Sequence, residues 1–186
     1  MKVSVGISNR HIHLSDIDYK TLFKDTPMEI RNKLKQPGQF ASNLVVDIEG
    51  PKGRIEKVRL LGPNRDYTQV EISKTDSYKL GVNPPIRNSG NLSGSSLITI
   101  IGPYGKIEKE CCIIATRHIH VDEKIIKEKK LDNIKEVKIK IFGEKSGIID
   151  HVYLKKTDDA FFELHLDTDD ANAFLLNQDD EVEIIL

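Results

Sequence analysis

Two copies of the tetrapeptide Arg-His-Ile-His hold four of the six histidines in this chain. They occupy residues 10–13 and 117–120, and each follows a β-branched run. In an extended strand, side chains two residues apart point to the same side, with Cβ atoms roughly 6–7 Å apart. Each pair of imidazoles can therefore converge on one metal ion or on one anion. A single His-x-His is often an ordinary strand pair, but its duplication favours a binding site.

A catalytic zinc site usually has three protein ligands and one open position, so each histidine pair needs a further ligand. We predict His165 as one of these, because it lies in an expected strand that stops at an Asp-rich helix start; His151 is the alternative. Glu71 is the plausible carboxylate for the first pair, although in isolation it reads as an exposed strand residue. Imidazole and carboxylate also suit cobalt and iron, so the ligands alone do not select zinc.

Arg65 follows Gly-Pro-Asn on an expected turn. A guanidinium held in this way can grip a phosphate with two hydrogen bonds. The polar loop 83–96, rich in glycine, proline and serine, offers amides and hydroxyls to a phosphorylated ligand, and long loops in compact domains are commonly functional.

Composition limits the partners. The chain has 186 residues, 31% of them charged, with a net charge of −1, and no basic block indicates nucleic-acid binding. No apolar run approaches the roughly 18 residues that span a membrane. Cys111 and Cys112 are the only cysteines and are adjacent, which favours reduced thiols and a cytoplasmic protein.

Short strands and tight turns dominate the remaining sequence. Residues 14–34 are expected to form a loop and a short helix. We expect strands at 44–48, 55–61, 97–101, 107–114, 137–141, 148–154, 161–166 and 182–186, and short helices at 75–80, 122–131 and 167–173. Such a pattern favours β-barrels over a wound parallel sheet. The repeated histidine motif suggests two related barrel-like halves.

Taken together, these motifs resemble the PduL-type phosphotransacylase (phosphate propanoyltransferase) family. The matching segments run from residue 3 to about residue 173, and their joint specificity is high although each alone is weak. They are residues 5–15, 61–65, 68–73, 81–95, 115–120 and 163–172.

The resemblance implies a mainly β fold of two small β-barrel domains with short capping helices and the active site between them. It implies that the N-terminal strand joins the C-terminal barrel, so that one domain is 1–9 plus 117–186 and the other is 10–116. It also implies the roles of the site residues: His11, His13 and Glu71 hold a first zinc ion, His118, His120 and His165 hold a second, and Arg65 is the catalytic, phosphate-binding arginine.

The activity implied is reversible conversion of acyl-CoA and phosphate to acyl phosphate and CoA, with two zinc ions per chain and coenzyme A as a substrate. The hypothesis is direct transfer, and acetyl and propanoyl groups both stay open. Family members housed in microcompartments carry an amphipathic N-terminal encapsulation segment that is not seen here, which favours the cytoplasm; the family also suggests a homodimer.

Two alternatives stay open at this point. Within enzymes, Cys111 or Cys112 could accept the acyl group in a ping-pong reaction. Outside enzymes, the chain could be a zinc-stabilised module that binds CoA or a phosphate ligand without catalysis, with its histidines serving the fold.

Overall fold

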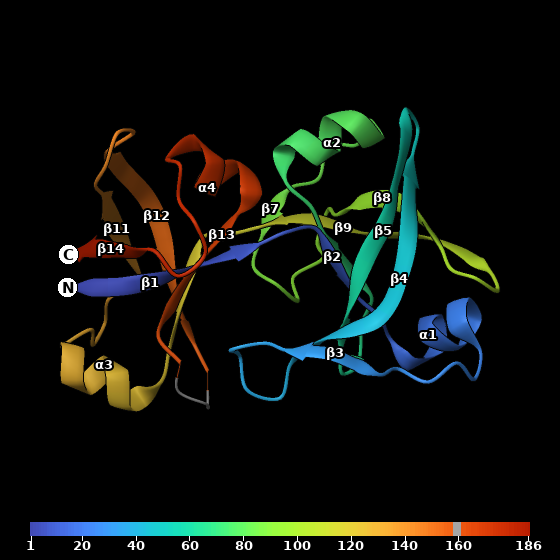
Figure 1. Cartoon of the computed structure of the whole chain (residues 1–186), viewed down its shortest axis with the longest axis horizontal. Helices are drawn as coiled ribbons and strands as arrows, with labels where there is room; N and C mark the ends of the chain where they lie inside the picture. Colours follow the sequence, from blue (N-terminus) through green and yellow to red (C-terminus); the bar gives the residue numbers. More distant parts are fainter. Residues whose placement is uncertain (158–160) are drawn as a thin grey trace. The chain divides into compact units, whose positions relative to one another are not determined.

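The computed structural model describes residues 1–157 and 161–186 and is mainly β (Figure 1). The chain divides into two compact units. Unit 1 comprises residues 1–9 and 116–186, and unit 2 comprises residues 10–115. Each unit contains a closed ring of six strands and two short helices in its described residues. The expected fold class, a mainly β chain with two small barrels, is therefore confirmed.

Unit 1 is a closed barrel with strand order β1-β13-β10-β12-β11-β14. Strand β11 shows why such segments form barrel walls, since its buried apolar residues alternate with exposed charged residues and so face one core. The elements are β1 (Lys2–Ser8), β10 (His118–Val121), α3 (Glu123–Lys129), β11 (Glu136–Ile141), β12 (Gly147–Lys156), β13 (Glu163–Asp167), α4 (Thr168–Ala173) and β14 (Glu181–Ile185).

Unit 2 is built from a path of strands β4-β5-β2-β6-β9, and β8 closes the ring because it pairs with both β9 and β4. Strands β3 and β7 extend this sheet at its edges. The elements are β2 (His11–His13), α1 (Asp16–Phe23), β3 (Ile30–Lys33), β4 (Phe40–Gly50), β5 (Gly53–Gly62), β6 (Gln69–Glu71), α2 (Lys74–Leu80), β7 (Ile86–Arg87), β8 (Ser96–Ile101) and β9 (Lys106–Ala115).

Two strands are additions to what the sequence predicted. Strand β3 lies in the segment expected to be loop and helix, and β7 lies in the polar loop 83–96. All four residues of β3 are exposed, and β7 has only two residues. Neither strand carries the alternation of apolar and polar residues that reveals a half-buried strand in sequence.

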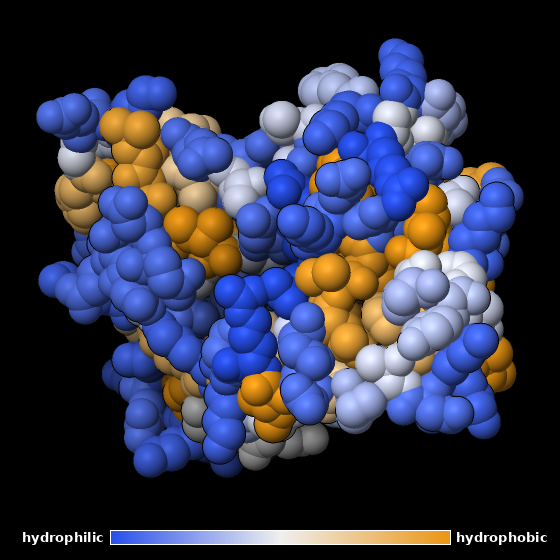
Figure 2. Space-filling model, turned by 45° about the vertical axis from the view of Figure 1, so that its right-hand side comes forward, coloured by the Kyte–Doolittle hydropathy of each residue, from blue (hydrophilic) through white to orange (hydrophobic). Residues whose placement is uncertain are grey.

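Hydrophilic residues cover most of the face seen in Figure 2, with smaller hydrophobic areas among them. Exposed apolar side chains of this kind are normal on globular proteins. Within the described residues, no helix is long and apolar enough to cross a membrane.

Candidate metal centres and an anion-binding arginine

The first histidine pair lies in unit 2, together with Glu71. Strand β2 places His11 and His13 on one side, while Ile12 is fully buried in the core. The antiparallel neighbour β6 sets Glu71 directly opposite His11. Nε2 of His11 lies 3.5 Å from Oε2 of Glu71. One ligand atom from each of His11, His13 and Glu71 lies within 4.8 Å of the others, so this group could hold a metal ion.

The second histidine pair lies in unit 1, together with His165. Strand β10 carries His118 and His120, and its antiparallel neighbour β13 sets His165 directly opposite His118. The three ring centroids lie 4.7–5.1 Å from one another. The ligand atoms of this group also lie within 4.8 Å of one another. The six residues predicted as ligands are thus brought together in two groups, and their role as metal ligands stays a prediction.

Two rings of the second group have features that suit a metal ion. Nδ1 of His118 donates to the Thr116 carbonyl at 2.8 Å, because a carbonyl can only accept, and the neutral ring then has its lone pair on Nε2. That atom lies 3.1 Å from Nε2 of His120. Burial, with His118 and His165 alongside, lowers the pKa of His120 to about 2, so the ring is neutral. Neutral imidazole is the form that binds metals.

His120 also carries an orphaned buried atom. Its Nδ1 is shielded from solvent and has no hydrogen-bond partner among the residues that the structure describes. Buried polar atoms are nearly always satisfied, so this atom is an exception; it lies on a different side of the ring from Nε2. Phe161 stacks on His120 with ring centroids 4.4 Å apart and forms an apolar wall beside the group. The three converging imidazoles and the neutral His120 ring fit a metal ion.

His151, the alternative ligand, is in neither group. It lies within β12, has a positive φ of 54°, and is exposed. Its Nδ1 lies 3.3 Å from a carboxylate oxygen of Glu136.

Arg65 lies on the turn that follows β5, and unit 2 holds it by its backbone and its side chain. Its amide donates to the Leu14 carbonyl at 2.9 Å. Its Nη1 donates to the Tyr67 hydroxyl at 3.1 Å and to Ser89 Oγ at 3.2 Å. Its Nε and Nη2 make no hydrogen bond with any residue that the structure describes. A half-buried guanidinium with these donors available is suited to bind an anion such as phosphate.

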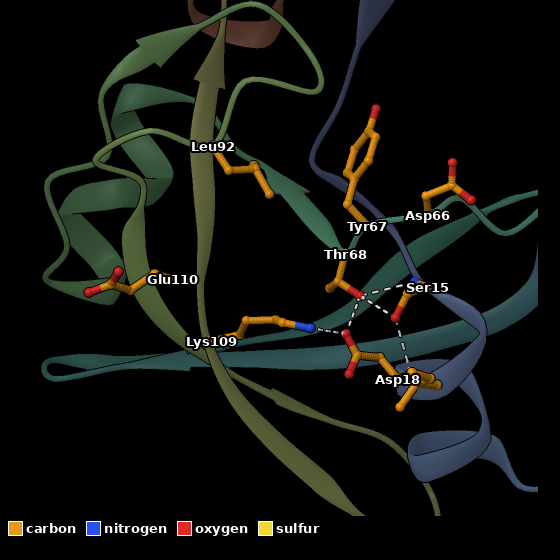
Figure 3. Close-up of a pocket in the computed structure, with 9 residues that line it drawn as sticks. Ser15, Asp18, Asp66, Tyr67, Thr68, Leu92, Lys109 and Glu110 are labelled. Carbon is orange, nitrogen blue, oxygen red and sulfur yellow. Dashed lines mark hydrogen bonds and ion pairs between the residues drawn. The ribbon is translucent and has the colours of Figure 1, made fainter.

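A small cluster beneath this turn fixes its position (Figure 3). The Ser15 amide donates to Thr68 Oγ1 at 3.0 Å, and Thr68 in turn donates to Asp18. Lys109 Nζ reaches the same carboxylate at 2.5 Å. Burial by itself favours a raised pKa for Asp18, but the hydrogen bonds from Lys109 and Thr68 outweigh it and lower that pKa. The cluster lines a pocket of about 290 Å³ whose wall includes the Tyr67 ring.

The two cysteines are poor nucleophiles. Both are fully buried in β9, and burial raises the pKa of Cys111 to about 12 and that of Cys112 further still. Because the thiolate is the reactive form, thiols with such pKa values are inert at neutral pH. This disfavours an acyl-cysteine intermediate.

Sequence reasoning missed several residues that shape these groups. Gln69 and Ser89 contact Glu71 and Arg65 in unit 2, and Glu163 contacts His165 in unit 1. Gln69 and Glu163 each stand two residues before a predicted ligand, on the same face of their strand, and that spacing is the signal that could have found them.

The comparison with known proteins gives the family of this chain. The family model for phosphate propanoyltransferase matches residues 4–177. The chain belongs to the phosphate propanoyltransferase family. A phosphate propanoyltransferase of Thermotoga maritima is 47% identical, with 98% of this chain and 89% of the relative covered. One from Rhodopseudomonas palustris is 43% identical over 98% of this chain and 82% of the relative. One from Salmonella typhimurium is 42% identical over 92% of this chain and 82% of the relative. Membership of the phosphate propanoyltransferase family makes the chain an acyltransferase.

Proposed function

We propose that this protein reversibly converts acyl-CoA and phosphate to acyl phosphate and CoA by direct transfer, using two zinc ions per chain. The observation that carries the proposal is the pair of three-ligand groups found in a member of the phosphate propanoyltransferase family. Three ligands with an open position are typical of catalytic zinc, whereas structural zinc usually has four. The names of the relatives favour a propanoyl group, and acetyl is the second candidate.

In this reaction a phosphate oxygen attacks the thioester carbonyl, the C–S bond breaks, and CoA leaves as a thiolate. Zinc bound by the two groups would supply positive charge to stabilise that thiolate and to polarise a reacting oxygen. Arg65 is proposed to bind the phosphate through Nε and Nη2, while Tyr67 and Ser89 hold Nη1. A guanidinium fixed in this way orients the attacking oxygen and offsets its charge without reorganising during the reaction.

The chain's other groups support direct transfer. Cys111 and Cys112 are buried as thiols, so neither is proposed to take the acyl group. His120 is neutral and suited to metal binding instead of proton transfer. Both substrates are therefore expected to be bound together, which gives sequential and not ping-pong kinetics. The cytoplasmic location and the homodimer stay predictions.

The test measures CoA release from propanoyl-CoA and acetyl-CoA, with and without phosphate, on protein whose metal content has been counted. Phosphate-dependent release together with two zinc ions per chain supports the proposal and ranks the acyl groups. Zinc without release from either thioester supports the ligand-binding module. Protein that purifies without metal and gains no activity when zinc is added contradicts the zinc mechanism.

Arg65→Met separates catalysis from a purely structural role of the metals. Loss of its guanidinium is expected to lower kcat/KM for phosphate by about 100- to 1000-fold, the usual effect of losing one preorganised donor to a developing charge. Metal content and thermal stability are expected to stay unchanged. Arg87→Met is the matched control, because Arg87 lies in the same unit and its guanidinium donates to the backbone carbonyls of Ser93 and Ile86.

A further inference from the structure

A chain of hydrogen bonds in unit 2 joins the carboxylate of the first metal group to the anion-binding arginine. Gln69 Nε2 donates to Glu71 Oε1 at 2.6 Å and to Ser89 Oγ at 2.9 Å. Ser89 Oγ also accepts from Arg65 Nη1 at 3.2 Å. A single buried amide therefore contacts the predicted metal ligand directly and the arginine through one hydroxyl.

The orientation of this amide is fixed by its other end. The Gly90 backbone N–H donates to Gln69 Oε1 at 2.7 Å, and a backbone N–H cannot accept, so the oxygen must face Gly90. The nitrogen then faces Glu71 and Ser89, with one hydrogen for each. Gln69 is fully buried, and both polar atoms of its side chain are hydrogen-bonded. A flipped amide would therefore leave several groups without a partner.

Unit 1 has the complementary arrangement at the corresponding place. Gln69 stands two residues before Glu71, and Glu163 stands two residues before His165. Glu163 is also buried, and its Oε2 lies 2.9 Å from His165 Nε2. The carboxylate ligand thus has an amide donor beside it, whereas the imidazole ligand has a carboxylate acceptor. Between the two units the ligand and the residue two positions before it change together. This indicates that the residue at that position is matched to the ligand beside it.

The geometry points to Gln69 as a positioning residue that orients Glu71 for metal binding and, through Ser89, couples the first metal group to Arg65. The coupling of Gln69 to Arg65, which concerns phosphate binding, rests on the function proposed above. The orientation of Glu71 for metal binding does not. Groups that hydrogen-bond to metal ligands fix their orientation, and their loss typically weakens metal affinity by about 10- to 100-fold.

The metal half is tested in a His120→Ala background, which leaves only the first group intact. Cobalt and zinc affinities are measured by competition with a chromophoric chelator, and the visible spectrum of bound Co²⁺ reports the ligand geometry. Gln69→Met keeps the length of the side chain but removes its hydrogen bonds. We expect it to weaken metal binding by about 10- to 100-fold and to change the Co²⁺ spectrum. An unchanged affinity and spectrum, in protein with native circular dichroism, would overturn the inference.

The coupling is tested in the otherwise unchanged enzyme by the KM for phosphate. Gln69→Met and Ser89→Ala are both expected to raise it, and the double variant is expected to show less than the sum of the two effects, because both act along one path. Ser89→Ala is expected to leave metal affinity unchanged. Thr21→Ala, in α1 of the same unit, is the control that changes neither quantity, because its exposed hydroxyl bonds only the Ile17 carbonyl of its own helix. Additive effects of the two substitutions would show that Gln69 and Ser89 act separately.

The two failures are distinguishable. Absence of phosphate-dependent CoA release in the unchanged protein contradicts the proposed function but leaves the metal measurement readable. A normal reaction with no effect of Gln69→Met on metal affinity contradicts the positioning role and leaves the proposed function intact.

Discussion

The two three-ligand groups are built on the same plan but end in different ligands. In unit 2, β2 pairs antiparallel with β6 and parallel with β5; in unit 1, β10 pairs antiparallel with β13 and parallel with β12. His11 faces Glu71 in one unit, and His118 faces His165 in the other. The strand arrangement is thus repeated. The group in unit 2 has two imidazoles and one carboxylate, whereas the group in unit 1 has three imidazoles.

The repetition extends to the helices that follow. Ser73 and Asp167 each stand two residues after the third ligand and cap a helix by accepting from the amide three residues on. In each case the residue three after the cap is an aspartate that bonds the arginine of the Arg-His-Ile-His motif, with Arg10 to Asp76 and Arg117 to Asp170. This contact joins the start of each histidine strand to the helix that follows its antiparallel neighbour, so strand pairing and ligand register are fixed together.

The largest expected effect comes from removing one ligand from each group. Glu71→Ala and His165→Ala are each expected to reduce the zinc content by one ion per chain. Because a catalytic metal supplies several kcal/mol of charge stabilisation, activity should fall on the order of 1000-fold in both variants. Zinc content by elemental analysis and CoA release by a thiol assay measure these effects. If one variant kept most of its activity, the two groups would not share one reaction, and the group it affects would be structural.

A smaller effect is expected when the third ligand of unit 2 is made identical to that of unit 1. Glu71→His places an imidazole where the Gln69 amide can only donate, so we expect metal affinity of the first group to fall by about 10- to 100-fold. The double substitution Gln69→Glu with Glu71→His reproduces the Glu163–His165 pair and should recover most of that loss. Chelator competition measures both variants. Failure to recover would show that ligand and neighbour are not a matched pair.

The sequence revealed the part of each group that is local. Arg-His-Ile-His is visible because its two ligands lie two residues apart in one strand. Glu71 and His165 lie 60 and 47 residues after His11 and His118, and residues 158–160 within the second interval lie outside the described residues. Only strand pairing brings these residues together, so the assignment of ligands to groups depended on the family resemblance.

Gln69 and Ser89 show what sequence reasoning could not supply. An amide and a hydroxyl have no spacing of their own that indicates chemistry, and they gain a role only when the loop 83–96 folds back onto β6. The orientation of the Gln69 amide is set by a hydrogen bond from the Gly90 backbone N–H. The order of side chains in the sequence does not indicate such a backbone contact. Arg65 was visible because it follows a rigid Gly-Pro turn, although its partners were not.

A substitution in the Asp18 cluster, next to the Arg65 turn, is expected to lower the stability of the fold without changing the zinc content. Asp18→Asn removes a carboxylate bonded by Thr68 and Lys109, and we expect a loss of about 1 kcal/mol in the free energy of unfolding near neutral pH. Since the folded state lowers the pKa of Asp18, this contribution is complete above the unfolded value of about 3.9 and is lost as pH falls through the folded value.

Denaturant unfolding of the Asp18→Asn variant and the unchanged protein from neutral to acid pH measures that difference. The two curves should converge at low pH, and zinc content should be the same in both proteins. Asp25→Asn, a change of an exposed carboxyl just after α1, serves as the control. A difference that grew towards low pH would contradict the sign argued here.

Little effect on activity is expected at the cysteines, and a comparison of the two units gives the reason. Strand β9 lies parallel to β6 with Cys112 opposite Val70, and β1 lies parallel to β13 with Val5 opposite Leu164. Cys112 and Val5 each stand six residues before the first histidine of their motif. Cys112 therefore occupies the place that valine fills in unit 1, and its thiol is expected to serve as a small apolar group.

Cys112→Val combined with Cys111→Ala is accordingly expected to keep most activity and both zinc ions, with a cost in unfolding free energy of about 1–2 kcal/mol from the smaller side chain at position 111. Steady-state kinetics with both substrates varied, and mass spectrometry of protein incubated with propanoyl-CoA, measure this. Loss of activity with fold and zinc retained, or an acyl group found on either cysteine of the unchanged protein, would replace direct transfer with a covalent route. Retained activity would instead leave the two metal groups and Arg65 as the parts of this chain on which the reaction depends.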